Sequence, residues 1–458
     1  MMRSMFSGVS GLRNHQLRMD VIANNVSNVN TIGFKGSRTL FSDVFTQTLM
    51  HASGASEGAG RGGVNPTQVG LGVNLFAIDR MMTQGAFQRT DINLDLAVSG
   101  NGFFIVRDAT GVFFTRNGAL RRDADDNVVI PSGHHLQGWR VMETPGWDPS
   151  MGMDTRFTTN RGPVQNIALT PTDLVSPPVR TLNTTFQGNL NPEVIRGPVE
   201  PPETIGPILT GPRIMNMNIT DSLGNNHVIS AEFQITDNGG AGQTEWLVTL
   251  RPPANSGLEL AMTGPGVSSG AGGTVNFPLV FNSQGTVVTP GSDGMDVTIT
   301  NTMSGTPAAM IGENGTITMH FGGLTQYAQF PGSASVSDVE GLPAGYLVDL
   351  AVGQDGTMMG VYSNGDMRPL WQIPLAQFSN PAGLEAVGGS LFRQSANSGV
   401  FDGIGNIGVL QGGVLEMSNI DLSAEFTDMI ITQRGFQASS RLITTSDDML
   451  QELVNLRR

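Results

Sequence analysis

Two glycine-rich motifs in the sequence have spacings that could support chemistry. Residues 403–408 read GIGNIG, which matches a dinucleotide-binding turn, and Glu425 and Asp428 follow about 20 residues later. No apolar strand precedes this motif, and no βαβ pattern surrounds it. Residues 266–270 read GVSSG, the pattern of a hydrolase nucleophile turn, but they lie in a glycine-rich run with no histidine nearby in the sequence. Neither motif predicts an active site.

An acidic segment and a histidine pair are the candidate metal ligands. Residues 123–127 read DADDN, the opening of a calcium-binding loop, but that loop requires Gly at its sixth position and Glu at its twelfth. Val128 and His134 occupy those positions. The histidine pair at 134–135 lacks a third ligand at a suitable spacing. We interpret these residues as a polar turn and a strand edge, and we expect no metal, no cofactor and no enzymatic activity.

The composition excludes several further classes. The chain has 458 residues, no cysteine and a formal net charge of -14. Without cysteine there are no disulfides, thiolate nucleophiles or iron–sulfur clusters. The acidic balance disfavours nucleic acid as a partner because phosphates would be repelled. No apolar run approaches the ~18 residues that cross a bilayer, and the first residues lack the apolar core of a signal peptide. We expect no membrane insertion and, for a secreted chain, export without a cleaved signal.

Both ends of the chain are predicted to be helical. Residues 2–29 and 421–456 contain no proline, and apolar residues recur in both every seven positions. Asp421 or Asn419 is suited to cap the second helix, which contains one glycine, Gly435. A seven-residue period keeps the apolar line facing one partner, as in a coiled coil. The predicted contact residues are Met5, Leu12, Met19, Val26, Leu422, Met429, Phe436, Ile443 and Leu450.

We expect the two terminal helices to pair with each other. Their periods match, and their charges are complementary: residues 1–90 carry 8 basic and 4 acidic side chains, while residues 411–458 carry 4 basic and 7 acidic ones. The alternative is that each helix folds onto its own domain. If the ends pair, the chain between them must leave and return to the same place, so the middle is one long insertion.

The middle of the chain is predicted to be β structure. FFIV at 103–106 and VFFT at 112–115 alternate around a turn at 108–111, and 227–250 contains a second hairpin signal. Prolines flank the region 176–336. The expected fold is α+β and multidomain, with paired terminal helices and nested, mainly β domains. Residues 1–30 with 415–458 are expected to form the terminal helical domain, and residues 31–74 a connector with a mobile loop at 51–66. A discontinuous inner β domain is expected at 75–175 with 337–414, and an outer β domain at 176–336.

The residues that end the first helix also carry a family resemblance. Asparagine side chains compete for backbone hydrogen bonds and glycine permits positive φ, so these residues stop a helix. The stretch at 23–35 resembles the signature of bacterial flagellar axial proteins, the rod and hook subunits, through Asn24, Asn25, Asn28, Thr31, Gly33, Phe34 and Lys35. Further segments resemble the same family in the same order: SGNGFFIV at 99–106, FTRNGAL at 114–120 and the helix at 415–458.

This resemblance implies a structural subunit of the flagellar hook, a flexible curved tube that transmits torque as a universal joint. The insertion at 176–336 favours the hook over the shorter distal rod subunit. The implied partners are other copies of the chain, the distal rod, the hook cap, the hook–filament junction proteins and the export apparatus, outside the cell envelope. The alternative from another class is a secreted β-rich adhesin, although only four Trp and three Tyr are available to bind a ligand.

The terminal helices are expected to need other copies. Burying an apolar side chain contributes ~1.5–3 kcal/mol, whereas ordering each helical residue costs ~1–2 kcal/mol before hydrogen bonds are counted. We therefore expect mobile ends in the monomer that order on assembly. Four apolar residues off the predicted contact line offer a second face to neighbouring copies: Phe426, Ile430, Ile431 and Val454.

Overall fold

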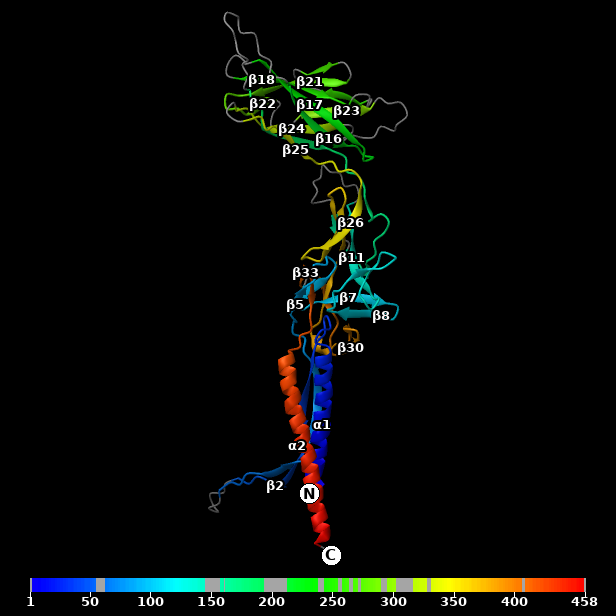
Figure 1. Cartoon of the computed structure of the whole chain (residues 1–458), viewed down its shortest axis with the longest axis vertical. Helices are drawn as coiled ribbons and strands as arrows, with labels where there is room; N and C mark the ends of the chain where they lie inside the picture. The colour runs from blue at the N-terminus through cyan, green and yellow to red at the C-terminus, as the bar shows by residue number, and fades with distance from the viewer. Residues whose placement is uncertain are drawn as a thin grey trace, which may run out of the picture.

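The computed structural model describes residues 2–54, 62–144, 157–159, 161–192, 212–237, 243–253, 258–262, 267–270, 273–289, 295–301, 316–327, 331–405 and 408–456. These residues form an elongated molecule with a helical base, a middle β unit and a far β unit (Figure 1). None of the helices in these ranges is both long and apolar enough to span a membrane.

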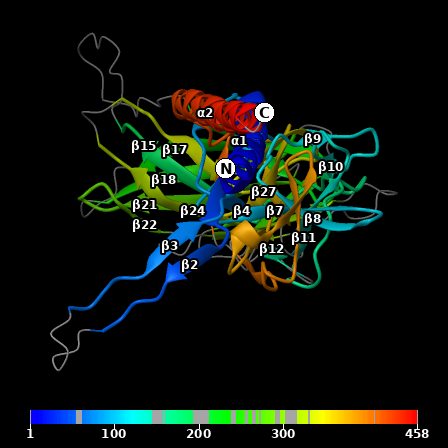
Figure 2. The ribbon, with the colours of Figure 1, turned by 90° about the horizontal axis from the view of Figure 1, so that it is seen from below.

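The terminal helices lie side by side and run in opposite directions (Figures 1 and 2). Arg18 forms an ion pair with Asp428 at 3.2 Å near the start of the second helix. The Oγ atoms of Ser4 and Ser446 lie 3.5 Å apart at the other end of the pair. The chain therefore returns to its starting point, and the middle is inserted between α1 (Met2–Ser27) and α2 (Leu422–Asn455).

Small residues make the closest approach between the helices. A Cβ atom added at Gly435 would lie 2.6 Å from Cε1 of His15, so only glycine leaves room for this ring. The buried residues of α2 are Thr432 and Ser446 rather than large apolar side chains. Other facing pairs are Gly8 with Ile443 and Gly11 with Ser439. The helices thus meet along a line of Gly, Ser and Thr. Asp421 caps α2, as predicted, by accepting two backbone N–H groups.

A narrow β ribbon follows α1. Its strands pair antiparallel. The half nearest the helices lies along α1, where the Asn14 amide donates to the Val73 carbonyl at 2.8 Å, and the far half projects away from the helices (Figure 2). The predicted connector at 31–74 therefore consists largely of strands, and residues 55–61 of the predicted mobile loop lie outside the described residues. The paired strands are β1 (Ser37–Asp43) with β4 (Val73–Arg80) and β2 (Thr46–Met50) with β3 (Thr67–Gly70).

The middle β unit joins two distant stretches of the chain in one sheet, in the order β14-β26-β27-β28-β11-β7-β8-β31-β30. The strands of this path are β7 (Phe103–Asp108), β8 (Gly111–Thr115), β11 (His135–Glu143), β14 (Val175–Ser176), β26 (Gly345–Val352), β27 (Thr357–Tyr362), β28 (Met367–Gln372), β30 (Glu385–Gly388) and β31 (Leu391–Arg393). Short strands extend it: β9 (Arg121–Arg122), β10 (Val128–Val129), β12 (Phe157–Thr159), β13 (Gln165–Asn166), β29 (Leu375–Gln377) and β32 (Asp402–Gly405).

Two further strand pairs connect this unit to the base. They are β6 (Leu96–Ser99) with β33 (Val409–Gly412) and β5 (Phe87–Arg89) with β34 (Val414–Glu416). The hairpin predicted around 108–111 is confirmed as β7 and β8, with Phe104 opposite Thr115. In its turn the Asp108 carboxylate accepts the backbone N–H groups of Thr110 and Gly111. A one-turn 3-10 helix, η4 (Pro381–Gly383), lies between β29 and β30.

The far β unit is a sandwich of two sheets around one core. The rings of Phe186 and Phe321 stack at 4.8 Å, and Phe277 from the other sheet lies 5.5 Å from Phe321. One sheet contains β15 (Asn183–Asn189), β19 (Leu258–Met262), β23 (Met295–Asn301), β24 (Thr316–Thr325) and β25 (Ser335–Val339). The other contains β16 (Arg213–Thr220), β17 (Asn226–Asp237), β18 (Thr244–Arg251), β20 (Ser268–Gly270), β21 (Thr274–Phe281) and β22 (Val287–Thr289).

Two connecting segments of the chain, one leading to the far unit and one returning from it, form the neck between the β units. Val179 and Leu342 exchange backbone hydrogen bonds of 2.9 Å in both directions. Just above this bridge, the Thr181 N–H donates to the Thr220 carbonyl at 3.0 Å. The far unit is thus joined to the middle unit through one paired crossing.

Phe321→Ala should loosen the far sandwich by about 3–5 kcal/mol because it removes a buried ring from a close-packed core. Hydrogen exchange of the full chain should accelerate in β15, β17 and β21, while the middle sheet keeps its protection. Phe76→Ala is the matched control, since Phe76 is 72% exposed. Equal acceleration in both variants would contradict this description of the core.

Candidate assembly site

The residues predicted to contact a partner lie along the helix pair, and none is buried in the single chain. Leu422 is 39% exposed, and the other eight are half-buried. The half-buried residues are Met5, Leu12, Met19, Val26, Met429, Phe436, Ile443 and Leu450. One copy therefore covers these side chains only in part, and their burial by other copies stays a prediction.

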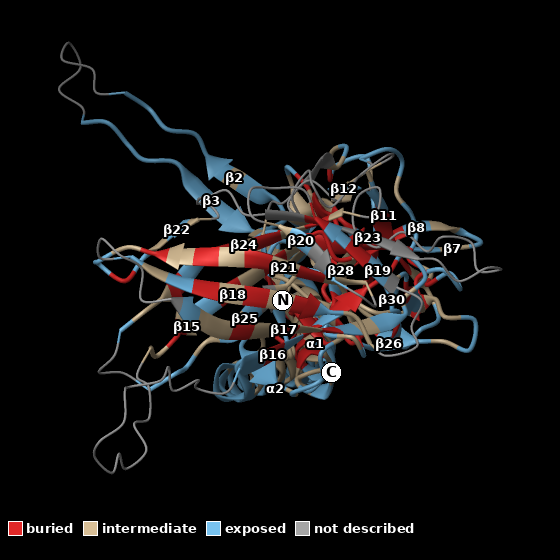
Figure 3. Ribbon diagram, turned by 90° about the horizontal axis from the view of Figure 1, so that it is seen from above, coloured by how far each residue is buried: buried red, intermediate tan, exposed pale blue. Residues whose placement is uncertain are grey.

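A second set of apolar side chains on the helices is exposed. On α2, Ile430 and Ile431 are 58% and 55% exposed, and Phe426 and Val454 are also open. On α1, Phe6 is 67% exposed. Viewed from the far unit, α2 is largely pale blue, whereas red segments gather in the β units (Figure 3). The end of α2 also extends beyond the start of α1 (Figure 1).

Asn25 of the family motif joins three parts of the chain. Its side-chain amide donates to the Ser37 carbonyl at 2.8 Å and to the Glu425 carboxylate at 3.0 Å. Its Oδ1 accepts the Ser37 N–H at 3.0 Å. Because Asn25 is 2% exposed, these bonds form largely away from water. Asn25 thereby fixes the end of α1 against both β1 and the first turn of α2.

The rest of the motif ends α1 and turns the chain. The Asn28 amide donates to the backbone carbonyl and Oδ1 of Asn24, and its own Oδ1 accepts the Thr31 hydroxyl. Gly33 has φ of 66°, and a Cβ there would lie 2.8 Å from the Arg116 backbone. Any larger residue would therefore be both strained and obstructed. Phe34 is half-buried beside this turn.

Lys35, the last residue of the motif, takes part in a buried charge cluster. Its Nζ lies 2.6 Å from Glu416 Oε1, while Arg116 Nη1 lies 3.2 Å from Glu416 Oε2. The Gly85 N–H donates to the same carboxylate at 3.0 Å. All three charged side chains are at most 3% exposed. One carboxylate thus joins the N-terminal motif, the middle β unit and β34, which leads into α2.

Burial controls the electrostatics of this cluster. Removal from water lowers the pKa of Lys35, and the attraction of Glu416 only partly opposes that effect. Burial likewise lowers the pKa of Arg116. Two cations share one carboxylate, so the Lys35 ammonium also donates to the Thr83 carbonyl and Arg116 donates to the Gly100 carbonyl. These neutral acceptors add to the solvation of the two cations, while the buried Nε of Arg116 has no hydrogen-bond partner among the described residues.

Asn419 extends the junction toward α2. Its Oδ1 accepts the Gly36 N–H at 2.8 Å, and its amide donates to the Met81 carbonyl at 2.8 Å. The sequence offered Asn419 as an alternative helix cap, but its side chain instead binds the segments on either side of the ribbon. Asn419 therefore holds the start of α2 to both ends of the ribbon.

The residues considered for catalysis or metal binding lie in strands and turns in the part of the chain that the structure describes. The chain passes from β32 to β33 around 403–408, and the described residues near 266–270 form β20, so no helix follows either motif. At 123–127, Asp123 accepts two backbone N–H groups in a turn between β9 and β10. The described residues contain no group of three potential metal ligands.

Sequence reasoning missed Glu416 and Arg116. The available signals were that Lys35 is the only lysine in the chain and that Glu416 is an isolated acid between Leu415 and Met417. Neither signal identifies a partner, because Glu416 lies 300 residues from Arg116 and 381 from Lys35.

Glu416→Gln should destabilise the full chain by roughly 3–5 kcal/mol, because it leaves Lys35 and Arg116 buried without a counter-charge. Urea unfolding monitored by circular dichroism measures the change. Glu385→Gln is the matched control: Glu385 pairs with Arg393 at the surface, where such a pair contributes about 0–1 kcal/mol. A similar decrease in the free energy of unfolding in the two variants would refute the special role of Glu416.

Family models match four segments of the chain in order. They are described as flagella basal body rod protein at 5–35, flagellar hook protein FlgE/F/G D1 domain at 97–172, flagellar basal body protein FlaE D2 domain at 208–340, and flagellar basal body rod FlgEFG protein C-terminal at 411–456. The first and last of these contain the two helices that pair in the structure.

Full-length relatives agree with these matches. The chain is 38% identical to the flagellar hook protein FlgE of Borreliella burgdorferi and 35% identical to that of Treponema pallidum, with 100% of both chains covered in each comparison. It is 27% identical to the flagellar basal-body rod protein FlgG of Bacillus subtilis, also with both chains fully covered. The hook proteins are thus the more similar relatives in this set, and the chain belongs to the bacterial flagellar hook protein family.

Proposed function

We propose that the chain is a structural subunit of the bacterial flagellar hook, which assembles with other copies into a flexible curved tube. The observation that supports this most directly is the exposed apolar surface of α1 and α2. Three clusters of buried apolar residues lie in the β units, whereas Ile22 is the one large apolar side chain that is buried in the described part of the two helices. Large exposed apolar surfaces mark interaction sites. Neighbouring helices with the same surface would cover them.

The tube acts as a universal joint that transmits torque from the motor and rod to the filament. Subunits on the inner side of a bend must shorten their spacing, and those on the outer side must lengthen it. Charged residues make up only 14% of the chain, so few ion pairs need to break when β units slide. The paired neck at Val179 and Leu342 gives the outer unit one place to tilt.

The molecule is organised for this role as four units. Residues 1–30 with 415–458 form the inner helical layer, and residues 31–74 connect it outward. The middle β unit and the far β unit form two outer layers. Because β25 (Ser335–Val339) pairs with β15 in the far sandwich, the outer layer extends to the Val179–Leu342 neck rather than ending at residue 336. In this arrangement the helices polymerise, and the β units set the spacing between copies at larger radius.

The family is structural, and we assign the chain no catalytic activity. Its partners are other copies of itself, the distal rod, the hook cap, the hook–filament junction proteins and the export apparatus. The chain works outside the cell envelope, in the hook. A distal rod subunit is the second candidate, favoured by the similarity to the rod protein FlgG. Electron microscopy separates the two, because a hook forms curved tubes and a rod forms straight ones.

Deletion of 1–29 or of 422–458 should abolish polymerisation while both β units stay folded, because the helices supply the contacts between copies. Sedimentation and electron microscopy monitor the tubes, and circular dichroism monitors the strands. Tubes formed by either truncated chain would contradict the proposal. In the full-length monomer, fast hydrogen exchange at both ends is expected, and slow exchange there would show that the helices order without assembly.

Ile430→Glu should reduce tube formation at least about tenfold, because a charge buried between copies costs more than the ~1.4 kcal/mol that corresponds to this factor. The thermal stability of the monomer should change little, since Ile430 is 58% exposed. Gln437→Glu is the matched control because it introduces the same charge at an exposed polar position of α2. Equal assembly of the two variants would argue against an interface at Ile430.

A further inference from the structure

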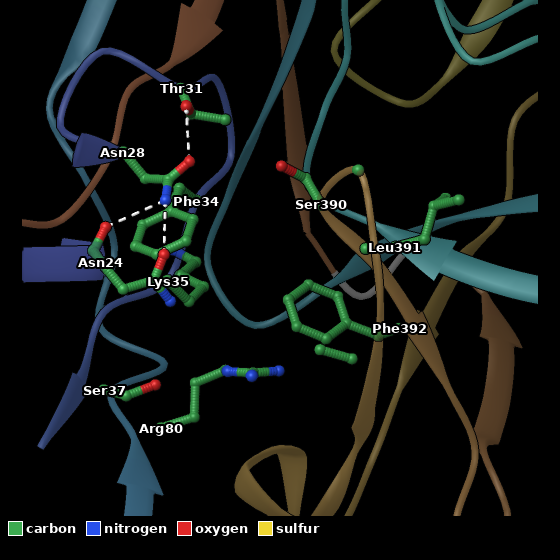
Figure 4. Close-up of a pocket in the computed structure, with 13 residues that line it drawn as sticks. Asn24, Asn28, Thr31, Phe34, Lys35, Ser37, Arg80, Ser390, Leu391 and Phe392 are labelled. Carbon is green, nitrogen blue, oxygen red and sulfur yellow. Dashed lines mark hydrogen bonds between the residues drawn. The ribbon is translucent and has the colours of Figure 1, made fainter. Parts of the chain in front are cut away.

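A hollow beside the family motif contains an arginine without a counter-ion. Arg80, the last residue of β4, lines this hollow of about 320 Å³ together with Asn24 and Thr31 of the motif and Ser390 of the β30–β31 turn (Figure 4). Its Nη1 is buried and has no hydrogen-bond partner in the described part of the chain. Buried charges in proteins are normally paired. No described residue of the same copy supplies a partner for this atom.

Arg116 provides the comparison within the same molecule. Burial lowers the pKa of both Arg80 and Arg116. Arg116 is compensated by Glu416 at 3.2 Å, whereas no carboxylate of the described residues lies within ion-pair distance of Arg80. The adjacent acid, Asp79, faces Arg38 at 3.7 Å. Arg80 is half-buried rather than fully buried like Arg116, and its buried Nη1 has no acceptor among the described residues.

The geometry favours an oxyanion as the missing half. The guanidinium carbon of Arg80 lies 5.3 Å from the centre of the Phe392 ring, and Figure 4 shows the group between this ring and the motif. An aromatic ring interacts with the face of a guanidinium, which leaves the N–H groups at its edge for a ligand. Two parallel N–H donors match the two oxygens of a carboxylate.

The composition of the chain indicates the source of the carboxylate. It contains 39 acidic residues and 25 basic ones, so packed copies bring a surplus of carboxylates to each basic site. We propose that the hollow around Arg80 accepts an Asp or Glu side chain from a second copy of the chain. This inference rests on the proposed assembly into tubes. It adds a polar, geometrically specific contact at the junction of the helices with the middle β unit.

The test uses the scarcity of amines in this chain. Lys35 is the only lysine and is buried, so Arg80→Lys adds the one accessible side-chain amine. Tubes are grown from full-length Arg80→Lys in a mixture of ¹⁴N- and ¹⁵N-labelled chains and treated with a carbodiimide, which joins an amine to a carboxylate that contacts it. If this variant does not polymerise alone, it is incorporated as a minority into tubes of the unmodified chain.

In tubes, mass spectrometry should find an amide between position 80 and an Asp or Glu of a different copy. The cross-linked peptide pair should then contain one ¹⁴N and one ¹⁵N partner, and monomers should not give it. Arg89→Lys is the control, because Arg89 pairs with Asp91 of its own chain and should give a cross-link of a single isotope. Arg80→Met should weaken tube formation several-fold, while its monomer keeps its melting temperature in buffer without phosphate.

Three results would overturn the inference. The first is a cross-link from position 80 only within one copy, and the second is no cross-link while the control reacts. The third is that inorganic phosphate stabilises the monomer, that Arg80→Met abolishes this stabilisation, and that no intermolecular cross-link forms. That combination would show that the hollow holds a free anion. Failure of the unmodified chain to form tubes would remove the proposed function as well, whereas normal tubes without the cross-link would remove this inference alone.

Discussion

The carboxylate of Glu416 is the contact on which the position of the helical base depends. It accepts hydrogen bonds from Lys35, Arg116 and the Gly85 N–H, which come from three separate parts of the chain. A buried ion pair often contributes little net stability compared with apolar packing, because desolvation offsets the attraction. Other orientations of the helices, which would leave one of these buried charges unpaired, are nevertheless strongly disfavoured. The cluster therefore selects one orientation of the helices relative to the middle β unit.

The sequence revealed elements whose pattern is local. Seven-residue periodicity placed the two helices, and alternation around a polar turn placed the β7–β8 hairpin. It did not reveal the β ribbon, because 29 residues lie between the end of β1 at Asp43 and the start of β4 at Val73, with no short turn to signal a hairpin. The Glu416 cluster was hidden for the same reason. Partners separated by hundreds of residues are brought together by the fold, and no spacing in one sequence records them.

The helix contact shows a different limit of sequence reasoning. Apolar periodicity identifies the surface that must be covered, but backbones approach most closely where side chains are small, as at Gly8, Gly11 and Gly435. Among the predicted apolar residues, Ile443 faces Gly8 in this contact, and it and the others stay half-exposed in one copy. Gly435 lowers helix propensity by about 1 kcal/mol relative to Ala, yet it makes room for the His15 ring. Packing between helices outweighs that local preference.

The two junctions of the molecule differ in a way that suits a joint. At the lower junction, three buried charges and the amides of Asn25 and Asn419 connect the base to the middle unit through many directional bonds. At the neck, two connecting segments of the chain join the middle unit to the far sandwich, and the reciprocal backbone bridge between Val179 and Leu342 holds these segments together. Tilting a unit costs least where the fewest buried polar contacts must break. In the proposed tube, the helices and middle units would therefore carry torque as one body, while the far units adjust their spacing by tilting at the neck.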